Sequence, residues 1–89
     1  QIKNYYLILF MHELSVAMDI VETLEKNGYL KGVQKVNEVK LSLGKYSGID
    51  ENYLSFAFQN LGDERFKDAV IDFISSENDE ITIKEIIVD

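Results

Sequence analysis

The stretch "VNEVKLSLGKYSGID", residues 36 to 50, decides the fold of this chain. Apolar and polar residues alternate over residues 39–43, and this two-residue period is typical of a strand with one buried face. Gly44 and Gly48 bracket the segment that follows, which indicates a turn because glycine is the residue that most easily reverses the chain. We therefore predict a strand that ends in a turn.

An amphipathic helix is predicted on each side of this stretch. Before it, apolar residues recur at spacings of three and four from Leu14 to Leu24, and Asn27-Gly28 supplies a stop signal. After it, the same spacing runs from Leu54 to Leu61. Ser47 or Asp50 is a plausible N-cap for this second helix, because both side chains carry an oxygen that accepts a backbone N–H.

The rest of the chain completes a small sheet. Residues 69–75 and 81–88 are rich in β-branched side chains and are predicted to be strands, separated by a polar loop of hairpin length at residues 76–80. The order is helix-strand-helix-strand-strand. Because each helix has one apolar stripe, we expect an α+β fold with two helices packed on one face of a three-stranded sheet.

Composition excludes several functions. A chain of 89 residues forms one small domain. A net charge of −7 argues against nucleic-acid binding, because phosphate contacts need clustered Lys and Arg. The absence of cysteine excludes disulfides and thiolate zinc sites. No stretch approaches the roughly 20 apolar residues of a membrane span, so we expect a cytoplasmic protein that binds no membrane.

His12 is the only histidine of the chain, and Glu13 follows it directly. An imidazole, a carboxylate and deprotonated backbone amides suit a borderline ion such as Ni(II), which accepts square-planar nitrogen donors. If Met11 were the first residue, its amine would add a third nitrogen to the His12 amide and imidazole. The alternative is that His12 is a surface or capping residue, and the pattern alone leaves both open. No spacing favours catalytic carboxylates, so we do not expect an enzyme.

The segment "MHELSVAMDIVETLEKN" from Met11 onward resembles the start of the HypA-type nickel metallochaperones, which serve [NiFe]-hydrogenase and urease maturation. The similarity continues through residues 36–50, "ENYLSFAFQNL", "DAVIDFI" and "ITIKEIIVD", so it covers residues 11–89. The resemblance implies the same fold and a function in delivering nickel. Its implied partners are the nickel-insertion GTPase of this system, approached through the start of the first helix, and other hydrogenase or urease maturation proteins.

The resemblance also implies a metal site. It makes His12 the principal nickel ligand, with Glu13 contributing through its backbone or carboxylate. Asp50, at the acidic position that ends the turn, is implied as a further oxygen donor or a support for the site, with an N-cap of the second helix as the alternative. The rival function is a small protein-interaction domain in which His12 has only a structural role.

The sequence departs from the family at two places. The family places a four-cysteine zinc module between its last two strands, where this chain has only residues 76–80. Either the module has been deleted or the chain is a natural short form. In neither case do we expect the chain to bind zinc. Residues 1–10 lie before the position at which the family's sequences start. They are either vector-derived or the product of an upstream read-through. Their apolar run predicts an extra strand that pairs two chains in a homodimer.

Overall fold

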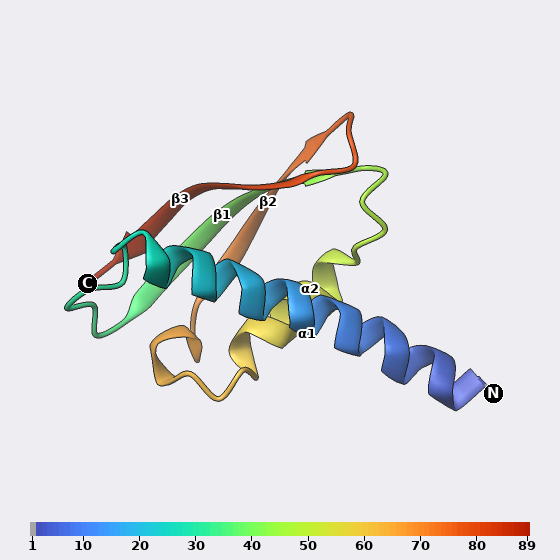
Figure 1. Cartoon of the computed structure of the whole chain (residues 1–89), viewed down its shortest axis with the longest axis horizontal. Coiled ribbons are helices and arrows are strands. Elements are labelled where there is room, and N and C mark those ends of the chain that lie inside the picture. Colours follow the sequence, from blue (N-terminus) through green and yellow to red (C-terminus); the bar gives the residue numbers. More distant parts are fainter. Residues whose placement is uncertain (1) are drawn as a thin grey trace.

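The computed structural model describes the backbone of residues 2–89 and the side chains of residues 12–89. The observed order of elements confirms the predicted helix-strand-helix-strand-strand arrangement (Figure 1). A short 3-10 turn, η1, is added before the second strand. The elements are α1 Ile2–Lys26, β1 Val36–Gly44, α2 Glu51–Gln59, η1 Glu64–Phe66, β2 Val70–Ser76 and β3 Ile81–Val88.

The sheet is mixed, with strand order β2-β1-β3. β1 pairs in parallel with β2, as a crossover through α2 requires, and antiparallel with β3. The polar loop predicted at residues 76–80 joins two strands that do not pair with each other, because β2 and β3 lie on opposite sides of β1. Because β1 is the central strand of the sheet, it is buried more completely than β2 or β3.

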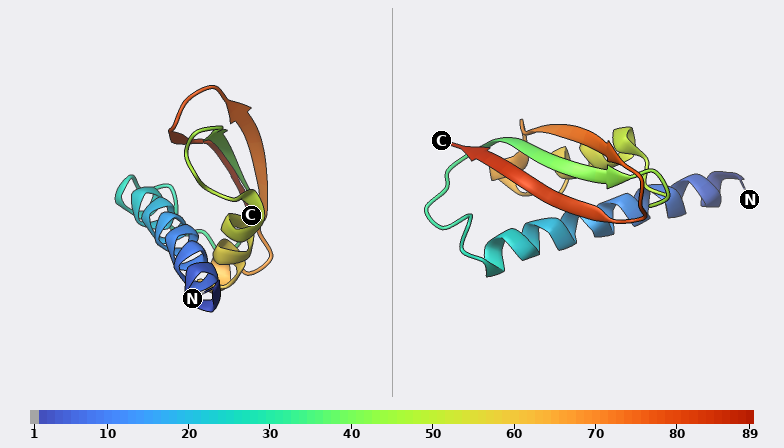
Figure 2. Two further views of the ribbon diagram at one scale, coloured as in Figure 1. Left: turned by 90° about the vertical axis from the view of Figure 1, so that its right-hand side faces the viewer. Right: turned by 90° about the horizontal axis from the view of Figure 1, so that it is seen from above.

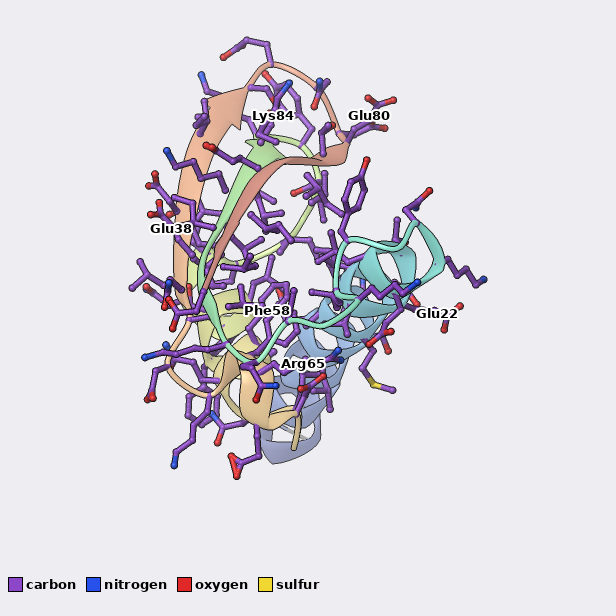
Figure 3. The ribbon with its side chains drawn as sticks, turned by 90° about the vertical axis from the view of Figure 1, so that its left-hand side faces the viewer. Glu22, Glu38, Phe58, Arg65, Glu80 and Lys84 are labelled. Atoms are coloured by element: carbon purple, nitrogen blue, oxygen red, sulfur yellow. The ribbon has the colours of Figure 1, made fainter. Side chains whose placement is uncertain are left out.

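Both helices cover the same face of the sheet, as predicted (Figure 2). The pairing register aligns apolar side chains of all three strands on that face: Leu41 lies between Phe73 and Ile83. Phe58 of α2, labelled in Figure 3, and Phe66 of η1 are fully buried, with ring centroids 5.9 Å apart. The fully or nearly buried core is Ala17, Ile20, Leu24, Leu30, Val36, Val39, Leu41, Leu54, Ala57, Phe58, Phe66 and Ala69.

α1 ends where the sequence predicts. Gly28 has φ +78°, a left-handed conformation that glycine adopts without strain. Its N–H donates to the carbonyl of Glu25 at 3.1 Å, and the N–H of Tyr29 donates to that of Leu24 at 3.0 Å. This is the Schellman pattern of hydrogen bonds, which satisfies carbonyls left free at a helix end.

α1 begins much earlier than expected. The predicted strand in residues 1–10 is wrong for residues 2–10, which are helical and continue without a break into the predicted helix. Figure 1 shows these first turns of α1 projecting beyond the sheet and α2. The basis for a homodimer through strand pairing is therefore removed. No helix among the described residues is long and apolar enough to cross a bilayer.

Residues 77–80 arch over the end of β1. The backbone N–H groups of Gly44, Lys45 and Tyr46 donate to the carbonyls of Glu80, Ser76 and Asn78 at 2.8, 2.9 and 3.0 Å. The arch thus ties β2 and β3 to the turn after β1.

We expect Gly44→Ala to lower the free energy of unfolding by about 1–3 kcal/mol, the usual effect of overpacking. A Cβ on Gly44 would overlap the backbone carbonyl of Asn78, so the arch would have to move. Urea denaturation measures the loss. The nearest obstacle is the backbone carbonyl of Asn78, and the side-chain Oδ1 is only the second. Adding Asn78→Ala should therefore restore little of the stability, and full recovery in the double variant would contradict this explanation.

Arg65, the only arginine of the chain, joins η1 to α1. Its guanidinium donates to Asp63 at 2.7 Å and to Glu25 at 2.5 Å (the residue is labelled in Figure 3). The hydrogen bond from Arg65 lowers the pKa of Asp63, and the hydrogen bond to Asp63 raises the pKa of Arg65. Both side chains are about three-quarters covered, so the pair is screened less than an exposed one.

We expect Arg65→Ala to lower the free energy of unfolding at pH 7 by about 1–2 kcal/mol. A folded-state pKa below the ordinary 3.8 of Asp63 stabilises the protein above that pH. The contribution disappears as the pH falls through the lowered value, so the deficit of the variant should shrink below pH 4. Urea denaturation at several pH values measures this. Lys67→Ala, an exposed control, should show neither effect.

Candidate metal site

His12 is exposed on α1, ten positions after Ile2, the first residue of the helix. Because the helix continues upstream, the amides of His12 and Glu13 are interior to it. An α-helix directs them to the carbonyl oxygens four residues earlier. In this chain those amide nitrogens are therefore occupied by helical hydrogen bonds. The imidazole alone is presented freely to solvent.

Glu13 points the other way and is only 1% exposed. Its Oε2 accepts the backbone N–H of Asp50 at 2.9 Å, which joins α1 to the start of α2. Its Oε1 is buried and has no hydrogen-bond partner within residues 12–89. Buried polar atoms usually have a partner, so Glu13 is the one side chain of the candidate site with an unused acceptor in the interior.

Asp50 is the N-cap of α2, which confirms one of the two residues predicted for this role. Its backbone is extended, and its Oδ1 accepts the N–H of Tyr53 at 3.0 Å. The turn before it is held by the Ser47 hydroxyl, which accepts the N–H of Ile49 at 3.2 Å. The Asp50 carboxylate is therefore committed to the helix start, while its backbone amide is committed to Glu13.

The structure brings two of the three predicted residues together. Glu13 and Asp50 meet through a side chain and a backbone amide, whereas His12 lies one residue, or about 100° of helix rotation, away from Glu13. Among the side chains of residues 12–89, no group of three His, Cys, Asp or Glu is placed to hold a metal ion. A metal held here needs backbone donors beside His12.

Sequence reasoning missed the burial of Glu13, although a signal was present. Glu13 precedes Ala17, Ile20 and Leu24 by four, seven and eleven residues, which puts it on the buried stripe of α1. A carboxylate on that stripe needs a donor in the interior. That donor is the N–H of Asp50, 37 residues later.

The comparisons with known proteins agree with this fold. Residues 11–85 match the family model described as hydrogenase/urease nickel incorporation, metallochaperone, hypA. The hydrogenase maturation factor HypA of Syntrophus aciditrophicus is 41% identical over 54 residues, which are 61% of this chain and 47% of that protein. HypA of Methanosarcina barkeri is 40% identical over 60 residues, 66% and 45% of the two chains. The chain thus spans about half the length of these relatives.

The solution structure of the Ni metallochaperone HypA from Helicobacter pylori has a TM-score of 0.57. It covers 86% of both chains at 17% identity, so it supports the fold alone. This chain has no cysteine and cannot supply a thiolate zinc site. Because the family model matches most of the sequence, this chain belongs to the HypA family of hydrogenase/urease nickel-incorporation metallochaperones, which carry a metal and are not enzymes.

Proposed function

We propose that this chain is a cytoplasmic nickel-carrying domain that delivers Ni(II) during maturation of hydrogenase or urease. His12 is the principal ligand in this proposal, and the backbone amides beside it supply further nitrogens. The observation that carries it is the position of the only histidine: exposed on α1, directly before a buried Glu13 that fixes this part of the helix against α2. An exposed site suits an ion that must be passed on.

Glu13 and Asp50 support the site in different ways. The Glu13 carboxyl group holds the start of α2 beside His12 through Oε2, and its buried Oε1 has no hydrogen-bond partner within residues 12–89. Asp50, whose backbone N–H binds Glu13, also carries an exposed carboxylate at the start of α2. The proposed recipient is the nickel-insertion GTPase of the maturation system, which would approach the face of α1 that carries His12.

The helix upstream of Met11 weakens this site. Within a continuous helix, nickel must displace the hydrogen bonds of the His12 and Glu13 amides before those nitrogens become donors. In a chain that begins at Met11, these amides lie in the first turn, where helix N–H groups have no intrahelical acceptor. Such a chain also has a free amine at Met11, which adds a nitrogen donor.

Isothermal titration of Ni(II) into both chains tests the proposal. We expect the chain that begins at Met11 to bind one equivalent about tenfold or more tightly than the chain of 89 residues, since one donor and two amides are gained. Circular dichroism is the control that both chains are folded. Absence of one-equivalent binding in both would favour the rival function, a protein-interaction domain in which His12 has only a structural role.

A further inference from the structure

β3 is an edge strand with one free side. Its other side pairs with β1, and no strand covers the free side within the described part of the chain. The N–H of Gly44 donates to the carbonyl of Glu80. Because backbone groups alternate in direction along an antiparallel strand, Thr82 then points toward β1, and the N–H and C=O groups of Ile81 and Ile83 point outward.

A groove runs along this free side, between β3 and α1. Its first hollow, of about 480 Å³, is lined mainly by Val16, Asp19, Ile20, Thr23, Ile81 and Ile83. A second hollow of about 410 Å³ begins at Thr23 and Ile83 and continues toward Tyr29. Figure 2 shows α1 running beside β3, and residues of both elements line the two hollows.

His12 lies on the face of α1 that forms the groove wall. Successive residues of a helix are rotated by about 100°, so His12, Val16, Asp19 and Thr23 fall within an arc of about 60°. His12 is one turn before Val16, and it therefore marks the end of the groove nearest the start of the family match. A ligand that follows the groove in this direction reaches His12.

A bulge in β3 limits the length of free edge that can pair with another strand. Lys40 pairs with Glu85 and Leu41 with Ile83, so Lys84 is an extra residue in β3 that interrupts the regular ladder. Such bulges end or redirect strand pairing. The regular part of the free edge is Ile81–Ile83, directly beside the first hollow.

We propose that an extended peptide segment of a partner protein binds here as a fourth strand, with alternate apolar side chains in the groove and a basic side chain at Asp19. The outward backbone groups of Ile81 and Ile83 give the main-chain hydrogen bonds of strand addition. Val16, Ile20 and Ile83 line an apolar floor for every second side chain.

Charge selects the partner. Asp19 is exposed at the groove and has no ion pair among residues 12–89, where five ion pairs are formed by other residues. The whole chain carries a net charge of −7, so a basic segment is attracted and a second copy of this chain is repelled. A basic, alternating peptide therefore fits the groove better than self-association.

The groove also gives the proposed nickel transfer a direction, and this part rests on the proposed function. A segment bound along β3 and α1 lies beside His12. The receiving protein is then held next to the residue that releases the nickel ion. The docking itself requires no metal and is tested on the metal-free protein.

The test is a titration of the ¹⁵N-labelled, metal-free chain with a capped heptapeptide. One face of the peptide carries two valines and a lysine, and the other face carries only threonine. We expect chemical-shift changes at residues 16–23 and 81–83, with slowed amide exchange at Ile81 and Ile83. A peptide of the same composition without the alternation is the control and should bind at least about tenfold more weakly.

Asp19→Lys should weaken peptide binding about tenfold, whereas Asp68→Lys, an exposed acid outside the groove, should leave it unchanged. Absence of binding at millimolar peptide, shifts confined to the opposite sheet face around Val70 and Ile74, or equal binding by Asp19→Lys would overturn the proposal. Concentration-dependent shifts at the groove without peptide would also overturn it, because a second copy would then be the occupant. Because the titration is made without metal, its result is separate from the nickel assignment.

Discussion

Replacing His12 with alanine in a chain that begins at Met11 is expected to lower the affinity for Ni(II) by about a hundredfold or more, or about 2.7 kcal/mol. The imidazole is the only nitrogen side chain of the proposed site, and a hard carboxylate is a poorer donor for square-planar nickel. Competition titration against a chelator of known affinity measures the loss. Because His12 is exposed, the variant should keep its fold and its stability.

Ser15→Ala is the matched control for this change. Ser15 is also exposed and lies three residues further along the same helix, so its replacement alters the helix surface without removing an imidazole. We expect its nickel affinity to equal that of the parent chain. If His12→Ala retained the parent affinity, the ion would have to be held elsewhere and the assignment of His12 would be wrong.

Glu13→Ala is expected to lower the free energy of unfolding by about 2–4 kcal/mol, the largest stability effect that we predict. The substitution removes a buried side chain and leaves the N–H of Asp50 without its acceptor at the junction of α1 and α2. The loss therefore combines a cavity with an unsatisfied donor. Urea denaturation of the metal-free protein measures it.

Two further variants separate these contributions. Glu13→Gln keeps the volume and an accepting oxygen, so its stability should stay within about 1 kcal/mol of the parent. Asp50→Ala keeps the backbone N–H and loses only the cap to Tyr53, which should cost about 1 kcal/mol. A loss in Glu13→Ala no larger than that in Asp50→Ala would show that the buried contact does not hold the helices together.

The sequence predicted most elements of the fold because their apolar periods are regular. The stop of α1 before Gly28, the alternation in β1 and the N-cap at Asp50 all follow from local chemistry. The strand order did not follow, because β2 and β3 are adjacent in sequence and the pairing of each with β1 depends on the crossover through α2. Residues 2–10 were misassigned because a short apolar run fits a strand and a buried helix equally well.

The residue types of the candidate site were proposed from the sequence, and its geometry was not. The family resemblance selected His12, Glu13 and Asp50, and local spacing allowed an N-cap at Asp50. The contact between the Glu13 carboxyl group and the Asp50 amide joins positions 37 residues apart, and no local pattern fixes such a distance. The position of Glu13 on the apolar stripe of α1 indicates only that its side chain is buried. Its hydrogen-bond partner, the N–H of Asp50, is known only from the fold.

A ¹⁵N-correlated NMR spectrum of the nickel-loaded chain that begins at Met11 tests the central claim most directly. Square-planar nickel bound by nitrogen donors is diamagnetic, so we predict sharp signals throughout the domain. The His12 amide signal should disappear, because that nitrogen has exchanged its proton for the metal. Broad, paramagnetically shifted signals around His12, or a His12 amide signal that persists at one full equivalent of nickel, would contradict the account.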